Sequence, residues 1–207
     1  MKSIETELES GLKLLDFSDF DQQYLITKLT TYIKLIEKWN RVYNLTAVRD
    51  PIDMVNRHII DSLMVAPHMK TSGDLILDVG TGAGLPGIPL SVVFPHKKFT
   101  LLDSSQKKQI FLQHVVQSLA LNNVSLQCIR TEAYRPDFQF NTIVSRAFAP
   151  LGKMLALTGH LLAPEGQFLA MKGKLDPEEF ASIGSDYKVT QVIPLSLFGH
   201  LVIIMRN

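Results

Sequence analysis

Apolar residues recur at helical spacing through the first 43 residues of the chain. The first run steps by three and four, at Ile4, Leu8, Leu12 and Leu15. Gly11 interrupts it, which predicts one short helix or two half-helices. Ser18 or Asp19 is expected to cap a longer helix that ends at a left-handed Asn44, and Asp50 with Pro51 begins another. The apolar positions of the longer helix are Leu25, Leu29, Tyr32, Ile36, Trp39 and Tyr43.

From residue 74 onward, short apolar runs alternate with stretches of helical periodicity, which indicates a parallel sheet with crossover helices. After a first strand that starts at Leu75, strands are expected at 98–103, 124–129, 142–145 and 166–172. The helices between and after them are expected at about 84–94, 105–121, 150–162 and 176–183. Two further apolar runs, 189–194 and 201–205, predict a terminal antiparallel hairpin joined by residues 196–200.

The expected architecture is therefore an α/β fold with a doubly wound, mostly parallel, Rossmann-like sheet. Residues 1–70 form an N-terminal helical extension packed on a core of residues 71–207. At 207 residues the chain is long enough for one well-buried core but short for two full domains.

Four glycines, at positions 80, 82, 84 and 87, directly follow the first strand. They let the backbone turn tightly and leave no Cβ between its N–H groups and a ligand. Pro86 suits the first turn of the following helix because its missing N–H would be unpaired there. This strand, turn and helix start favour a nucleotide-type pocket over a purely structural turn.

Two ligand classes fit this loop. Gly82, Gly84 and Gly87 satisfy the G-x-G-x-x-G spacing of a dinucleotide site. However, a pyrophosphate near Asp78 would suffer a repulsion on the order of a few kcal/mol at an effective dielectric of about 20. S-adenosylmethionine has no phosphate, and its amino group and sulfonium are positive. Asp78 therefore favours the methyl donor, although the spacing alone leaves both ligands open.

Ligands of an open parallel sheet lie over the carboxyl ends of its strands, so the residues after each strand are the candidates. Asp103 lies roughly 20 residues beyond the glycines, where a carboxylate accepts ribose hydroxyls. The alternative for Asp103 is to cap the next helix, although Ser104 and Ser105 could do so. Thr131 and Glu132 suit the adenine edge, unless Glu132 is merely a surface acid.

Arg146 follows the fourth strand within a largely apolar run, where an unpaired guanidinium would be costly to bury. Its expected anionic partner is the carboxylate of the methionine moiety or an RNA phosphate. Lys172 and Lys174 follow the fifth strand and add positive charge to the same rim.

Two further groups carry both a functional and a structural interpretation. His58 and Asp61 are three apart on one expected helical face, close enough to hydrogen-bond, as acid–base machinery or as a local anchor. Lys34, Lys38 and Arg41 form a basic stripe that could meet RNA phosphates or be a solvated face.

Composition narrows the setting but not the substrate. A net charge of +1 neither supports nor excludes RNA as a partner. The single cysteine cannot form an internal disulfide, and the N-terminal sequence lacks the pattern of a signal peptide. The apolar runs are far shorter than the roughly 20 residues of a membrane span. We therefore expect a cytoplasmic monomer without a membrane partner.

Six stretches of the sequence together resemble one family. They are WNRVYNLT at 39–46, RHIIDS at 57–62, DVGTGAGLPGIPL at 78–90, LLDSSQKKQIFL at 101–112, SRA at 145–147 and KG at 172–173. In this order and spacing the chain is similar to the RsmG/GidB family, the ribosomal RNA small-subunit methyltransferases G. Lys108 and Asn141 depart mildly from the family pattern, away from the positions considered below.

The resemblance implies a class I methyltransferase that uses S-adenosylmethionine to methylate ring nitrogen 7 of one guanine in 16S ribosomal RNA of the small ribosomal subunit. Because that nitrogen has an available lone pair, in-line transfer requires no general base. The family positions carried over are Gly80, Leu85, Thr131, Glu132 and Arg146, and the spacing arguments add Gly82 and Asp103. A methyltransferase of small molecules or proteins, an NAD-dependent oxidoreductase and a non-catalytic RNA-binding protein remain as alternatives.

Overall fold

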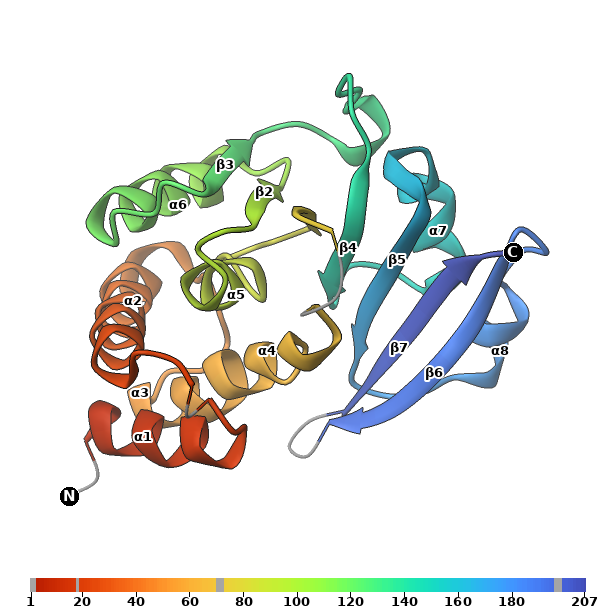
Figure 1. Ribbon diagram of the computed structural model, residues 1–207. Helices are drawn as coiled ribbons and strands as arrows, with labels where there is room; N and C mark the ends of the chain where they lie inside the picture. The colour runs from red at the N-terminus through yellow and green to blue at the C-terminus, as the bar shows by residue number, and fades with distance from the viewer. Residues whose placement is uncertain (1–2, 18, 70–72, 196–198) are drawn as a thin grey trace.

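A computed structural model describes residues 3–17, 19–69, 73–195 and 199–207 (Figure 1). Its centre is a seven-stranded sheet with the order β3-β2-β1-β4-β5-β7-β6. The strands are β1 (Leu75–Val79), β2 (Lys98–Leu102), β3 (Val124–Gln127), β4 (Phe140–Arg146), β5 (Leu162–Lys172), β6 (Tyr187–Leu195) and β7 (Gly199–Arg206). The order reverses between β1 and β4, which places the topological switch point at their carboxyl ends.

The pairing confirms the predicted doubly wound sheet with a terminal hairpin. Strands β1 to β5 pair in parallel, whereas β7 pairs antiparallel with both β5 and β6. Strand β5 begins at Leu162 instead of 166, and its first residues pass through Pro164. Strand β4 extends to Arg146, so this arginine is the last residue of the strand. Residues 196–198 of the expected connection lie outside the described residues.

Alternate side chains of the buried strands enter two hydrophobic cores on opposite faces of the sheet. Ile76 of β1 belongs to one core, and Leu77 and Val79 belong to the other. The first face is covered by α5 (Gly87–Val93) and α6 (Gln106–Ser118), and the second by α7 (Leu151–Thr158) and α8 (Pro177–Ala181) (Figure 1). The result is a sheet between two helical layers.

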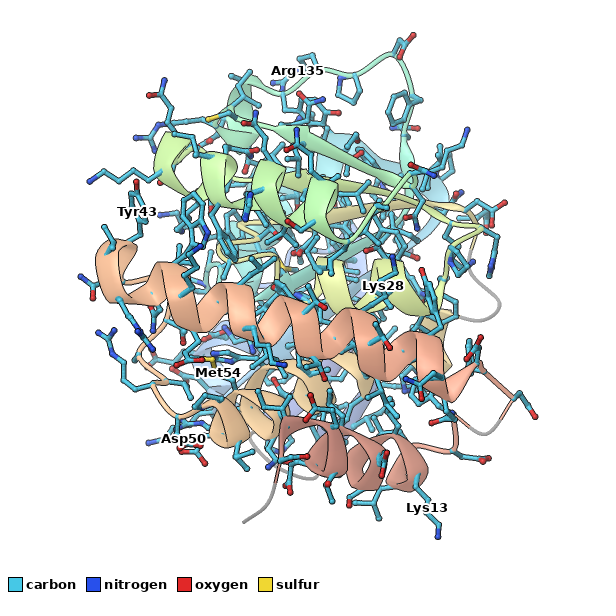
Figure 2. All side chains as sticks on the ribbon, turned by 90° about the vertical axis from the view of Figure 1, so that its left-hand side faces the viewer. Lys13, Lys28, Tyr43, Asp50, Met54 and Arg135 are labelled. Atoms are coloured by element: carbon cyan, nitrogen blue, oxygen red, sulfur yellow. The ribbon has the colours of Figure 1, made fainter. Side chains whose placement is uncertain are left out.

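The N-terminal segment adds α1 (Ile4–Leu14), α2 (Gln22–Tyr43), α3 (Pro51–Met54), a π-helical stretch over Val55–Ile60 and α4 (Asp61–Leu63). Figure 2 shows α2 crossing between α6 on one side and α1 and α3 on the other, with Lys28 and Tyr43 in different halves of the helix. Leu29 and Tyr32 of α2 share one core with residues of α5 and α6. None of the described helices is long and apolar enough to cross a membrane.

The ends of α2 and the course of α1 can be compared with the sequence predictions. The N-cap of α2 is Asp21, whose carboxylate accepts from the backbone of Tyr24, so Asp19 is not the cap; Ser18 lies outside the described residues. Asn44 ends the helix at φ +47°, as predicted. Gly11 does not split α1, which is one helix, the first of the two predicted possibilities. A Cβ at Gly11 would lie 2.3 Å from the Ile60 side chain. The glycine instead allows α1 to pack closely on the π-helical stretch.

Candidate functional site

The glycine loop after β1 takes the backbone shape that its sequence predicts. Gly80, Gly82 and Gly84 have φ values of +66°, +63° and +96°, in the left-handed region that favours glycine. The N–H of Gly80 donates to the carbonyl oxygen of Leu102 at 2.9 Å, which ties the loop to the end of β2. A Cβ at Gly80 would lie 2.4 Å from the ring of Phe148. Any larger residue at this position would therefore displace the ring or the loop.

Asp78 lies beneath this loop, inside the protein. Its side chain is fully buried, and Oδ2 accepts from Thr81 Oγ1 at 2.6 Å and from the Gly87 N–H at 2.8 Å. Burial raises the pKa of Asp78 to about 7, against the opposing effect of these two hydrogen bonds. The sequence indicated Asp78 as a charge near a ligand, whereas the structure shows its carboxylate bonded to the loop from within the protein. Asp78 fastens the start of α5 to the end of β1.

A cavity of about 430 Å³ opens above the carboxyl ends of four strands. The residues that line it after β1, β2, β3 and β4 are Gly80, Asp103, Thr131, Glu132 and Ala147. We call this space the first cavity. Four of the seven predicted cofactor positions therefore converge on it. The remaining three, Gly82, Leu85 and Arg146, do not line it.

Asp103 binds the glycine loop to the start of α6. Its Oδ2 accepts from the Gly82 N–H and from Lys108 Nζ, each at 3.0 Å, and its Oδ1 accepts from the Ser105 N–H at 2.9 Å. Ser105 is the N-cap of α6, but its side chain makes no capping hydrogen bond. Ser105 thus occupies the N-cap position that the sequence allowed for a serine, but the side chain that holds this helix start is the Asp103 carboxylate. Gly82 lies next to the cavity through this contact.

Arg146 has an anionic partner within the chain. Its Nη1 lies 3.5 Å from Asp61 Oδ2 and donates to the carbonyl oxygen of Arg57 at 3.0 Å. From the sequence we expected an anionic partner for Arg146 and named only ligands as candidates, whereas within the protein Asp61 supplies a negative charge. Burial raises the pKa of Asp61, and the Arg146 guanidinium opposes that rise.

His58 and Asp61 do not form the predicted hydrogen bond. The stretch Val55–Ile60 is π-helical, so the spacing of an α-helix does not apply to it. His58 Nε2 instead lies 2.8 Å from the Thr46 hydroxyl. Burial lowers the pKa of His58 to about 4, and the charge of Arg146 adds to this effect. The imidazole is therefore neutral near pH 7.

A second cavity, of about 280 Å³, adjoins the first at Ala147. Its lining comes from the N-terminal segment and from the ends of β4, β5 and β6: Val48, Arg57, His58, Asp61, Arg146, Ala147, Met171, Lys172, Gly173 and Leu195. Ala147 has a left-handed φ of +51°. At this bend Arg146 lines the second cavity and Phe148 lines the first.

Residues 40–49 form a turn that contributes to one wall of the second cavity, which the sequence did not predict. The buried Asn40 accepts from the Thr46 N–H at 2.9 Å and donates to the Val48 carbonyl oxygen at 3.2 Å. This pairing brings Thr46 to His58 and Val48 to the cavity. Two asparagines and two aromatic residues at the end of a helix indicate an ordered turn, but they do not indicate which residues that turn contacts.

The basic residues noted in the sequence are largely paired within the protein. Lys34 lies 3.6 Å from Glu5, and Arg41 lies 2.8 Å from Glu37. Lys172 lies 2.7 Å from Glu179. Two of the three cations of the predicted basic stripe, Lys34 and Arg41, therefore have acidic partners on the protein surface.

The reversed strand order at β1 and β4, the terminal hairpin and the glycine loop over the switch point are the features of the class I methyltransferase fold. The family described as rRNA small subunit methyltransferase G matches residues 25–201. The chain belongs to this family, which confirms the resemblance found in its sequence.

Individual proteins support the same assignment. Proteins named Ribosomal RNA small subunit methyltransferase G from Hahella chejuensis (strain KCTC 2396) and Salmonella schwarzengrund (strain CVM19633) are 42% and 46% identical to this chain over 206 and 204 residues. The alignments cover 97% and 96% of this chain, and 93% and 94% of the relatives. The crystal structure of a SAM dependent methyltransferase from Aquifex aeolicus shares the fold at a TM-score of 0.59 and 18% identity, over 86% of this chain and 98% of that one.

Proposed function

We propose that this chain transfers the methyl group of S-adenosylmethionine to nitrogen 7 of a guanine in 16S ribosomal RNA, as a monomer in the bacterial cytoplasm. Residues 1–70 act as a helical extension on the cofactor-binding core of residues 71–207. Family membership makes ribosomal RNA the expected substrate class. The observation that carries the cofactor site is the convergence of four strand ends on the first cavity.

The residues present in the first cavity fit S-adenosylmethionine. Its volume of about 430 Å³ lies within the ~300–1,000 Å³ typical of small-molecule sites. The absence of a Cβ at Gly80 makes room for the Phe148 ring that lines the cavity. Asp103 accepts three hydrogen bonds within the protein, which leaves about one lone-pair site of its carboxylate for a ribose hydroxyl. Thr131 and Glu132 also line the cavity, and we assign them to the adenine edge. Gly82 and Leu85 maintain the loop, Gly82 through Asp103 and Leu85 from its buried position.

Arg146 is proposed to meet the methionine end of the cofactor. It flanks Ala147, which lines both cavities, so a ligand that extends from the first cavity toward the second approaches the guanidinium. Because Asp61 and the Arg57 carbonyl oxygen hold one nitrogen of Arg146, the guanidinium is oriented before a carboxylate arrives. The other N–H groups of its fork are available for that carboxylate.

When bound, S-adenosylmethionine supplies an electrophilic methyl group on a positively charged sulfur. The guanine nitrogen contributes its lone pair to the new bond, and the electrons of the broken carbon–sulfur bond remain on sulfur. The protein need not remove a proton, so its task is to hold the two reactants in line and exclude water. A neutral His58 and the bend at Ala147 fit a positioning role at the meeting point of the cavities.

Transfer of a radioactive methyl group tests this function. The purified chain should label small-subunit rRNA, as naked RNA or within the subunit, when the RNA comes from cells that lack this chain. RNA from cells that contain the chain should accept little label because its site is already occupied. Labelling of ribosomal proteins or of small molecules with no labelling of RNA would contradict the proposal.

A further inference from the structure

We propose that the second cavity holds the target guanine and that Asp61 reads its Watson–Crick edge, accepting hydrogen bonds from N1–H and from the exocyclic N2 amino group. This inference rests on the proposed function and extends it to recognition of the acceptor. Its basis is the position of one buried carboxylate in a cavity that adjoins the cofactor cavity.

The two cavities are arranged as donor and acceptor sites require. Ala147 lines both, so a base in the second cavity would lie next to a ligand that fills the first. Enzymes that modify a base generally take it out of its stack and hold it in a separate pocket. The second cavity, of about 280 Å³, is smaller than the first, as expected for a base alone.

The lining of the second cavity combines apolar surfaces with one acid. Val48, Met171 and Leu195 provide apolar contacts for the faces of a ring, and Asp61 is the only carboxylate among the lining residues that the structure describes. Arg57 is exposed at this cavity, where a cation suits the phosphate beside a flipped nucleotide. Lys172 lies nearby but is paired with Glu179.

Asp61 retains hydrogen-bonding capacity toward a ligand. Within the described part of the chain, Arg146 is the partner of its carboxylate, at 3.5 Å. A carboxylate has about four lone-pair sites, so this contact leaves room for two further donors. His58, its neighbour in sequence, is turned toward Thr46 and does not compete for the same oxygens.

Guanine is the base that matches such an acceptor. Its Watson–Crick edge carries two adjacent N–H donors, which one carboxylate can accept together, whereas adenine, cytosine and uracil present an acceptor beside a donor there. Nitrogen 7 lies across the ring system from that edge. A guanine that binds Asp61 through N1–H and the N2 amino group can therefore turn nitrogen 7 toward the first cavity.

Inosine provides a direct test because it lacks only the N2 amino group and keeps nitrogen 7. Small-subunit rRNA would be prepared with guanine or inosine at the nucleotide that the labelling experiment identifies. The parent protein should methylate the inosine RNA with a kcat/KM about 10- to 100-fold lower, as expected for one lost hydrogen bond to a charged acceptor. The Asp61→Asn variant should lose this preference and process both RNAs slowly. Because the asparagine oxygen can still accept from Arg146, the Kd of S-adenosylmethionine should rise by much less than kcat/KM for the guanine RNA falls.

The exposed Asp53 provides the matched control, since Asp53→Asn should keep the parent rates and the guanine preference. Equal rates on both RNAs with the parent protein, or an unchanged preference in Asp61→Asn, would overturn the inference. A parent protein that labels no RNA would instead overturn the proposed function.

A second pair of variants covers the case in which Asp61→Asn does not fold. Gly173 lines the second cavity, and a Cβ there would meet no atom within 4 Å. A Cβ at Gly184 would also meet no atom within 4 Å, but Gly184 does not line this cavity. Gly173→Leu should lower kcat/KM for RNA at least tenfold while S-adenosylmethionine binds as before, and Gly184→Leu should behave like the parent. Methylation by Gly173→Leu at the parent rate would exclude the second cavity as the acceptor site.

Discussion

The guanidinium of Arg146 lies 3.5 Å from the carboxylate of Asp61 and joins the end of β4 to the N-terminal segment. Each charge is the internal partner of the other, in a region where both side chains are at least half-buried. This contact explains why the sequence has an arginine at the end of a buried strand. It also places a charge of each sign in the lining of the second cavity.

Removal of one member of this pair should destabilise the protein more than removal of both. Arg146→Met leaves the Asp61 carboxylate buried without a cation, so we expect the free energy of unfolding to fall by about 1–3 kcal/mol. The double variant Asp61→Asn/Arg146→Met should recover part of that loss. Urea unfolding of the parent, both single variants and the double variant measures the coupling. Strictly additive losses would show that the two residues do not stabilise one another.

Position 80 should tolerate no side chain larger than that of glycine, because the Phe148 ring occupies the space beside it. The Cβ of Gly80→Ala would lie 2.4 Å from the ring, which also lines the first cavity. We expect S-adenosylmethionine to bind at least tenfold more weakly to this variant by calorimetry. In a Phe148→Ala background the same substitution should cost much less, because the obstructing ring is gone. An identical loss of affinity in both backgrounds would assign the effect to the left-handed backbone alone.

Asp78 should be replaceable by asparagine but not by alanine. Alanine leaves the Thr81 hydroxyl and the Gly87 N–H without their buried acceptor, at a cost of about 1–3 kcal/mol for each unpaired group. Asparagine retains one acceptor oxygen and carries no charge to bury. Thermal unfolding and calorimetric S-adenosylmethionine binding should place Asp78→Asn close to the parent and Asp78→Ala well below it. Equal behaviour of the two variants would contradict the fastening role.

His58 should make the folded state sensitive to acid. Its pKa falls from the usual 6.5 to about 4 on folding, so between these values the unfolded chain binds a proton that the folded chain does not. Stability from this group is therefore complete above pH 6.5 and is lost as the pH falls toward 4. The loss is on the order of 3 kcal/mol.

Comparison with His58→Gln isolates this effect from that of Asp78. The raised pKa of Asp78, about 7, gives the opposite slope, since its stability contribution is lost as the pH rises from 3.8 toward 7. Above pH 7 the unfolding free energy of the parent should exceed that of His58→Gln by a constant amount. As the pH falls to 4, this advantage of the parent should shrink and then change sign. A difference that is independent of pH would show that His58 titrates normally.

Periodicity predicted the order of strands and helices because each buried strand and each amphipathic helix shows its own repeat. The glycine loop and the residues after each strand followed from the general rule for open parallel sheets. Contacts between distant segments were less accessible. Arg146 contacts the Arg57 carbonyl oxygen on the π-helical stretch and the Asp61 carboxylate in α4. A π-helix has no sequence signature, so the sequence did not reveal that His58 and Asp61 would not bond to each other.

The fate of Asp78 illustrates the same limit. An acid at the end of a strand is equally compatible with a ligand contact and with a contact beneath the loop, and only the three-dimensional path of residues 80–87 decides between them. The second cavity was similarly hidden, because its walls come from residues 48–61, 146–147, 171–173 and 195. Their proximity depends on how the N-terminal segment packs on the sheet.

The most direct test of the proposed function is the position of the methyl group in the cell. Small-subunit rRNA would be isolated from cells that lack this chain and from the same cells supplied with the parent or with Gly80→Val, and then mapped by nucleoside mass spectrometry and by strand cleavage at N7-methylguanine. We predict one N7-methylguanine that appears with the parent and is absent with Gly80→Val. Identical rRNA in all three cell types, or a methyl group on another atom, would contradict the proposed reaction.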